Sequence, residues 1–306
     1  RSTLFPYTTL FRSAKRLVLT YVILTAAEFL LLLASGCSVF NSACLAFSTI
    51  STGGFIPGAV VQNGITETIL VLFMILTSIN YTLYYHAVKR HFDKFEKNTE
   101  LNVLLFLLVG GAVLVSASLV ISGTCDVRSA IENGIFQTAS SISTTGLIID
   151  NTVKWPAFAK AVLAVLSFTG ASTCSLGSGI KIMRVATALK LISKSFTARI
   201  HPKAVVSTKI NGKSLSPEVS SSIGAYVLTY FAFYIIGAFI ISFQAGDLLE
   251  CFAVSGALLN NVGTVFSTGF SFTYLSQAML ILMSFIMLAG RLELYVVLLP
   301  FSRKQP

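Results

Sequence analysis

The string STGGF at residues 51–55 follows a short apolar segment and precedes a long one. The same order of segments occurs twice more, so the sequence contains three copies of one unit. The equivalent strings are Ser51-Thr52-Gly53-Gly54-Phe55, Ser143-Thr144-Thr145-Gly146-Leu147 and Asn260-Asn261-Val262-Gly263-Thr264. Copies that each contain an even number of full membrane crossings keep one orientation, as rotational symmetry about an axis requires. The strings therefore predict a ring of similar parts.

The composition is that of a membrane protein. Of the 306 residues, 54% are hydrophobic and 11% are charged, and the mean hydropathy is +0.80. A soluble domain carries about 25% charged residues, so a water-soluble globule is excluded. The 22 Lys and Arg residues cluster between apolar runs, which is typical of cytoplasmic loops and not of a nucleic-acid-binding face. The five cysteines are scattered and form no CxxC pair, so they indicate neither a disulfide framework nor a zinc site.

Six segments are long and apolar enough to cross a bilayer, which takes about 20 residues as a helix. They are residues 17–34, 65–88, 101–121, 158–192, 223–243 and 275–299. Three shorter segments, 38–50, 128–142 and 248–260, are candidates for re-entrant helices. Loops 35–64 and 244–274 contain no Lys or Arg. This asymmetry predicts a multi-pass protein of the inner (plasma) membrane with both ends of the sequence in the cytoplasm.

The first thirteen residues are predicted to be foreign to the fold. Residues 4–13 read LFPYTTLFRS, which is the translation of a common sequencing adapter, so residues 1–13 are interpreted as a cloning scar. The remainder divides into three units, 14–97, 98–213 and 214–306, of which the second carries a broken helix and a basic loop.

The residue types in the three strings suit a dehydrated monovalent cation. Such an ion needs several neutral oxygens, and inward-facing backbone carbonyls can replace its water shell. Glycine permits the positive φ angles that turn carbonyls toward one axis, and Ser and Thr add hydroxyl oxygens. The C-terminal end of a short helix adds a partial negative charge. The strings contain no carboxylate, which disfavours an acidic Ca²⁺ cage.

These residues resemble the Trk/Ktr/HKT superfamily of potassium transport subunits, and its Trk branch in particular. The resemblance covers about residues 14–301 and is carried by STGGF at 51–55, INYTLYYH at 79–86, STTG at 143–146, FTGASTCSLGSGIKIMR at 168–184, NNVG at 260–263 and GRLE at 290–293. It implies an all-α polytopic fold with four helix–pore-helix–filter–helix repeats around one pore. It also implies a homodimer and a cytosolic nucleotide-binding regulatory subunit.

The chain departs from that pattern in two places. Only three repeats are present, so we expect that the first repeat of the family is missing upstream and that the three units are the second, third and fourth repeats. In the last repeat, Asn261-Val262-Gly263-Thr264 stands where the family tends to have NVGPG, and Ser267-Thr268-Gly269-Phe270 follows soon after. The first string is favoured because it directly follows the short helix.

Residues 169–179, TGASTCSLGSG, interrupt an apolar span. Irregular backbone at membrane depth is tolerated only where protein or a water-filled cavity satisfies its polar groups. By spacing alone, this segment could also be a small-residue helix contact; the resemblance favours an intramembrane gate. The residues expected to form the gate are Gly170, Ala171, Ser172, Thr173, Cys174, Ser175, Gly177, Gly179, Lys181 and Arg291.

Three basic residues are predicted to have two different roles near this break. Lys181 and Arg184 lie just beyond it, where snorkelling to the cytoplasmic interface is the expected role. Arg291 is followed by about ten more apolar residues, and a charge at such depth normally faces a cavity or a partner. We expect Arg291 to contact the loop at 169–179 and to repel cations until the loop moves.

The predicted function is potassium uptake through a channel-like pore with a carbonyl filter and an intramembrane gate. The alternative is a secondary transporter that couples a small solute to Na⁺ or H⁺ at the broken helix. An enzyme is not expected, because the sequence offers no plausible nucleophile and base. The sequence has no GxSxG, P-loop or dinucleotide fingerprint, so K⁺ as the transported ion is expected and a bound organic cofactor is not.

Overall fold

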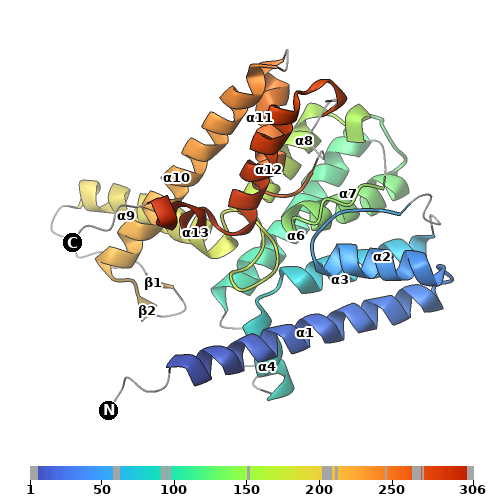
Figure 1. The fold of residues 1–306 in the computed structure, drawn as a ribbon, viewed down its shortest axis with the longest axis horizontal. Helices are drawn as coiled ribbons and strands as arrows, with labels where there is room; N and C mark the ends of the chain where they lie inside the picture. Colours follow the sequence, from blue (N-terminus) through green and yellow to red (C-terminus); the bar gives the residue numbers. More distant parts are fainter. Residues whose placement is uncertain are drawn as a thin grey trace.

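The computed structural model describes residues 6–57, 63–90, 95, 98–149, 152–201, 209–210, 213–244, 247–263, 270 and 272–301. Apart from a hairpin of two-residue strands, the described regular structure is helical, which confirms the all-α class. Three groups of helices follow one another along the chain. Figure 1 shows α1–α3 on one side, α10–α12 on another, and α6–α8 between them.

The first group contains α1 (Pro6–Ala34), α2 (Val39–Ile50), α3 (Gly64–Ser78) and α4 (Tyr81–Val88). Helix α1 starts inside the segment interpreted as a scar. Ser38 caps α2 by accepting a hydrogen bond from the Asn41 amide, and Asn80 caps α4 in the same way from Thr82.

The second group contains α6 (Thr99–Ile121), α7 (Val127–Ile142), the 3₁₀ turn η1 (Thr152–Lys154), α8 (Ala157–Thr169) and α9 (Ile182–Ile200). Strands β1 (Lys209–Ile210) and β2 (Lys213–Ser214) form an antiparallel hairpin that pairs Lys209 with Ser214.

The third group contains α10 (Pro217–Ser242), α11 (Leu248–Leu259), η2 (Phe272–Tyr274), α12 (Gln277–Arg291), α13 (Leu294–Leu298) and η3 (Leu299–Phe301). Each group thus runs from a long helix through a short one to a helix that is interrupted.

The expectation of six full-length spans is wrong for this structure. Among the described residues, three helices are long and apolar enough to cross a membrane, in Leu17–Ala34, Thr99–Ile121 and Pro217–Ser242. Helices α3 and α4 are long and apolar enough to span a membrane only when they are counted together, and the chain bends by 95° between them. The predicted spans 158–192 and 275–299 are each divided, as α8 with α9 and as α12 with α13. The sequence indicated a break only in the second unit, whereas the structure breaks the closing helix of every unit.

Buried apolar residues form three clusters. One joins the first two groups and includes Leu32, Leu45 and Leu104. A second lies among the helices of the third group, and a third joins α6 and α8 to Ala257 and Val262. Many large apolar side chains remain exposed on the outer faces, such as Phe106 at 74% and Leu228 at 73%. A helix that is apolar all round belongs in a membrane.

Candidate functional site

The three strings adopt the same backbone conformation. Thr52, Thr144 and Asn261 have φ angles of 55°, 57° and 55°. Two residues later, Gly54, Gly146 and Gly263 have φ angles of 73°, 77° and 82°. The left-handed region is uncommon for a non-glycine residue and is unfavourable for a β-branched one such as Thr. Its recurrence at one position in three separate strings identifies a repeated element, which we call the strips (51–54, 143–146 and 260–263).

Each strip begins where a short helix ends. The amide N–H of Gly53 donates to Ser48 O at 2.7 Å, that of Thr145 to Ser140 O at 3.1 Å, and that of Val262 to Ala257 O at 3.0 Å. These bonds join each strip to the last turn of the helix before it, which is α2, α7 or α11. They use amide groups of the strips and none of their carbonyl oxygens.

Consecutive strips touch at equivalent points. A Cβ added to Gly54 would overlap the carbonyl of Thr145, and a Cβ added to Gly146 would overlap the carbonyl of Val262. Thr145 and Val262 occupy the same position in their strips. The first strip therefore contacts the second in the same way as the second contacts the third. A Cβ on Gly263 would meet no described atom within 4 Å. Repetition of one contact between successive strips is what a ring of similar parts around a common centre predicts.

The hydroxyl groups of the second strip are packed inside the protein. Ser143, Thr144 and Thr145 are buried, and the Ser143 and Thr145 hydroxyl oxygens lie 2.7 Å apart. The residue after each strip differs between copies, since Phe55 is 79% exposed and Leu147 is fully buried. Thr264 and the alternative string at 267–269 lie outside the described residues.

The irregular segment 170–181 lies against the second strip. The amide N–H of Ser178 donates to the Thr144 hydroxyl at 2.7 Å, and a Cβ on Gly177 would crowd the carbonyl of Ser143. The segment also closes on itself, because Ile180 N donates to Phe168 O and Ile182 N donates to Ala171 O. We call residues 170–181 the central loop.

The central loop is also joined to the break between α3 and α4. Ser172 N donates to Ser78 O at 3.0 Å, and Tyr81 N donates to Cys174 O at 3.3 Å. Between these two bonds, the amide of Thr173 donates to the carboxylate of Glu100. The central loop thus connects the first two helix groups.

The snorkelling predicted for Lys181 is wrong. Its side chain is buried, and its ammonium donates to the carbonyls of Gly177 and Ser175, so it folds back into the central loop. The reason is that the loop presents carbonyl oxygens that need donors. Arg184 instead pairs with Glu293 at 2.7 Å and stands 4.0 Å above the centre of the Tyr226 ring. This pair ties the start of α9 to the start of α13.

Arg291 does not have the predicted partner. Its guanidinium donates to the Thr52 hydroxyl at 2.7 Å and to the Ser51 carbonyl at 2.8 Å. Within the described part of the chain, its hydrogen bonds go to the first strip and none goes to the central loop. A planar guanidinium suits two adjacent oxygens of this kind. The C-terminal end of α12 therefore reaches across to a strip of another helix group.

Sequence reasoning missed two polar side chains of this region. Glu100 is 3% exposed and lies beside the central loop, and Asn80 donates to it at 3.2 Å. The sequence did place the Glu100 carboxylate directly before the apolar run of α6, and this position could have marked it as a candidate. Glu293 lies two residues after Arg291 in the sequence, and in the structure it pairs with Arg184.

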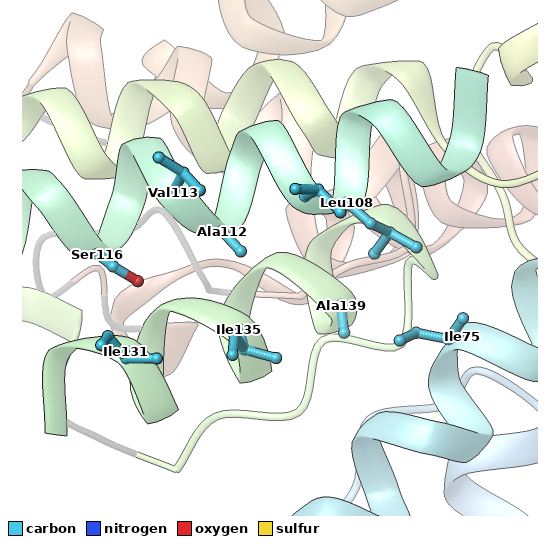
Figure 2. A pocket seen from close by; sticks show the side chains of 9 residues that line it. Ile75, Leu108, Ala112, Val113, Ser116, Ile131, Ile135 and Ala139 are labelled. Atoms are coloured by element: carbon cyan, nitrogen blue, oxygen red, sulfur yellow. The ribbon is translucent and has the colours of Figure 1, made fainter. Parts of the chain in front are cut away.

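Several hollows of the described structure have no strip residue in their linings. An apolar groove of about 570 Å³ runs between α6, α7 and the end of α3, as Figure 2 shows, with Ala112, Ile135 and Ile75 in its lining. Its apolar lining is unsuited to ions and suits lipid chains. A polar hollow of about 770 Å³ is lined by Glu67, Asp126 and Glu132 among others. The described residues contain no group of three His, Cys, Asp or Glu side chains able to hold a metal ion.

Comparison with known proteins agrees with this geometry. The family model TrkH, described as a cation transport protein, matches residues 3–306. The chain belongs to the TrkH family. That family is described as one of cation transport proteins, and the expectation that the chain is not an enzyme agrees with it.

Individual relatives are distant but extensive matches. The Trk system potassium uptake protein TrkG of Escherichia coli K12 is 27% identical over 296 residues, which cover 95% of this chain and 61% of that protein. TrkH of the same strain is 27% identical over 299 residues, covering 95% and 62%. The crystal structure of the potassium transporter TrkH from Vibrio parahaemolyticus matches with a TM-score of 0.91 at 24% identity, covering 99% of this chain and 66% of that one. The chain thus spans somewhat less than two thirds of these TrkH-family proteins.

Proposed function

We propose that the chain lines a channel-like pathway for potassium uptake across the inner membrane, with the three strips as its selectivity filter. The observation that supports this most is the repeated conformation of the strips and their equivalent contacts around one centre. Carbonyl oxygens that face such a centre can replace the hydration shell of K⁺. The relatives named for potassium uptake agree with this choice of ion.

The short helices α2, α7 and α11 would stabilise an ion at this centre. Each ends directly at its strip, so its last carbonyls and its partial negative charge lie close to the strip. An inward-negative potential supplies about 2.3 kcal/mol per elementary charge and 100 mV. Neutral oxygens and this potential suffice for uptake, and no covalent chemistry is required.

The central loop and Arg291 are proposed to control passage. The loop packs against the second strip, and Arg291 bonds to the first, so both occupy the immediate surroundings of the filter. A fixed guanidinium repels a cation that leaves the strips on that side. Passage would require the loop to move, and Arg291 would act on the ion directly instead of through the loop.

The membrane arrangement and the partners follow from the basic loops and the family. We propose cytoplasmic ends, repeats at 14–97, 98–213 and 214–306, a homodimer in the lipid bilayer, and a cytosolic nucleotide-binding subunit as regulator.

A coupled transporter is the second candidate, because one of its expectations has a counterpart in the structure. Glu100 is a buried acid beside the central loop, where a coupling ion or proton could bind. The strips, by contrast, contain no carboxylate.

Ion flux into proteoliposomes separates the two candidates. Under an inside-negative potential and without Na⁺ or pH gradients, the proposal predicts uptake of K⁺ and Rb⁺ in clear preference to Na⁺. Uptake that occurs only when a Na⁺ or H⁺ gradient is imposed would refute the channel-like mechanism and favour the coupled one.

A further inference from the structure

The central loop places backbone polar groups at membrane depth, where each needs a partner inside the protein. One side of the loop faces the break between α3 and α4, with two amide donors and one carbonyl acceptor. Three consecutive residues, Ser172, Thr173 and Cys174, form bonds there, and the middle one is made to a side chain. That side chain belongs to Glu100, whose carboxylate is the charged group among the partners of these three residues.

Glu100 is held ready for this contact by its own helix. Asn98 caps α6 by accepting from the amides of Glu100 and Leu101 at 2.9 and 3.1 Å. The cap fixes the backbone of Glu100 and leaves its carboxylate free. One carboxylate oxygen accepts from Thr173 N, and the other accepts from Asn80 at 3.2 Å. The carboxylate thus joins α6, the α3–α4 break and the loop.

We infer that Glu100 is the residue that anchors the central loop in the position that obstructs the pathway, and that its bond to Thr173 must break before the loop can leave. Glu100 is a positioning residue and does not touch the ion. This inference rests on the proposed gating function of the loop. Hydrogen bonds to a charged acceptor are about twice as strong as neutral ones, so this bond dominates the two main-chain bonds beside it.

Lys181 holds the central loop together, so that the loop can separate from Glu100 without losing its own shape. Its ammonium bonds to Gly177 and Ser175, which belong to the loop itself. The loop therefore keeps its own carbonyls satisfied when it separates from Glu100. When the loop separates from Glu100, the carboxylate loses its partner. Water must then reach it, because a buried charge without a partner is costly.

Cys174 provides a readout that does not depend on transport. It is the exposed cysteine next to Thr173, whereas Cys37 and Cys251 are buried and Cys44 and Cys125 are half-buried. We would replace those four by alanine and measure the rate at which a water-soluble methanethiosulfonate reagent modifies Cys174. Glu100→Gln is the test variant. Glu132→Gln is its control, because Glu132 is in an exposed pair with Arg128.

The expected result is a rise of about tenfold in the modification rate for Glu100→Gln, which corresponds to about 1.4 kcal/mol. Glu100→Asp, which keeps the charge on a shorter side chain, should give a smaller rise, and Glu132→Gln none. An unchanged rate in both Glu100 variants, with the protein still monodisperse in detergent, would overturn the inference.

Flux measured on the same variants separates the anchor from the gate. Faster Cys174 modification together with faster K⁺ uptake supports both. Faster modification with unchanged uptake supports the anchor and refutes the gating part of the proposed function. Equal modification by Glu100→Gln and Glu132→Gln refutes the anchor.

Discussion

Replacing Gly146 by alanine tests whether the strips depend on close backbone contact. Gly146 has a φ angle of 77°, and its Cα faces the carbonyl of Val262 so closely that a Cβ would overlap it. Left-handed backbone costs a residue with a Cβ about 1–2 kcal/mol. Overpacking adds typically about 1–3 kcal/mol. The carbonyl of the next strip must therefore shift, and the proposed filter would lose its geometry.

Two control variants separate the two costs. Gly36 has a φ angle of 96° with nothing within 4 Å of an added Cβ, so Gly36→Ala carries the backbone cost alone. Gly110 lies within α6 and also has no close neighbour, so Gly110→Ala should be neutral or slightly stabilising.

The assay is uptake of radioactive rubidium into membrane vesicles in competition with Na⁺. If the overlap displaces one carbonyl, a loss of about 1.4 kcal/mol lowers the preference for Rb⁺ about tenfold. Gly146→Ala should show at least this loss, while Gly36→Ala and Gly110→Ala keep the preference. Wild-type selectivity in a well-expressed Gly146→Ala protein would refute the reasoning.

Three further predictions concern Arg291 and two contacts elsewhere in the fold. Arg291→Ala should raise K⁺ flux about tenfold by removing about 1.4 kcal/mol of repulsion, and Arg291→Lys should have a smaller effect because the charge remains; equal flux in all three proteins would contradict the role of the charge. Gly134→Ala should lower thermal stability by about 1–3 kcal/mol because its Cβ would overlap the Ser116 hydroxyl, and adding Ser116→Ala should recover part of the loss; no recovery would show that this contact is not the cause. Arg184→Met and Glu293→Gln in a double-mutant cycle should give a coupling energy of about 1 kcal/mol in thermal unfolding, because the pair is partly exposed; additive effects would show that the pair does not stabilise the fold.

The strips were accessible to sequence reasoning because glycine stands at a fixed distance after a short apolar segment in each copy. Gly54, Gly146 and Gly263 all have positive φ angles in the structure, as that pattern requires. The left-handed conformation two residues earlier was not predictable in the same way. Thr52 and Thr144 are β-branched residues that normally avoid it, and only the contacts of the folded strip impose it.

The breaks in the closing helices show what composition cannot resolve. Residues 65–88 and 275–299 are predominantly apolar over a length that can span a bilayer, so hydropathy predicted one span from each. The structure ends α3 at Ser78 and starts α4 after the capping residue Asn80, and it separates α12 from α13 at Glu293, whose φ angle is 66°. A few polar residues are a weak signal within such a run, because the run also contains polar residues that do not break a helix.

Contacts between residues far apart in the sequence could not be predicted from it. Arg291 bonds to Thr52 between the third and the first copies, and Glu100 bonds to Thr173 within the second copy, 73 residues away along the chain. The sequence correctly marked Arg291 as a charge that needs a partner, but the partner follows from how the helix groups close around the strips. Lys181 was misplaced for a related reason, since its ligands are carbonyls of a loop whose shape only the fold defines.

Anomalous scattering from Rb⁺ or Tl⁺ in crystals of the protein tests the central claim most directly. The account predicts anomalous density at the common centre of the strips, within coordination distance of the carbonyls of residues 52–54, 144–146 and 261–263. Density confined to the acidic hollow near Glu67 and Asp126, with none between the strips, would contradict it.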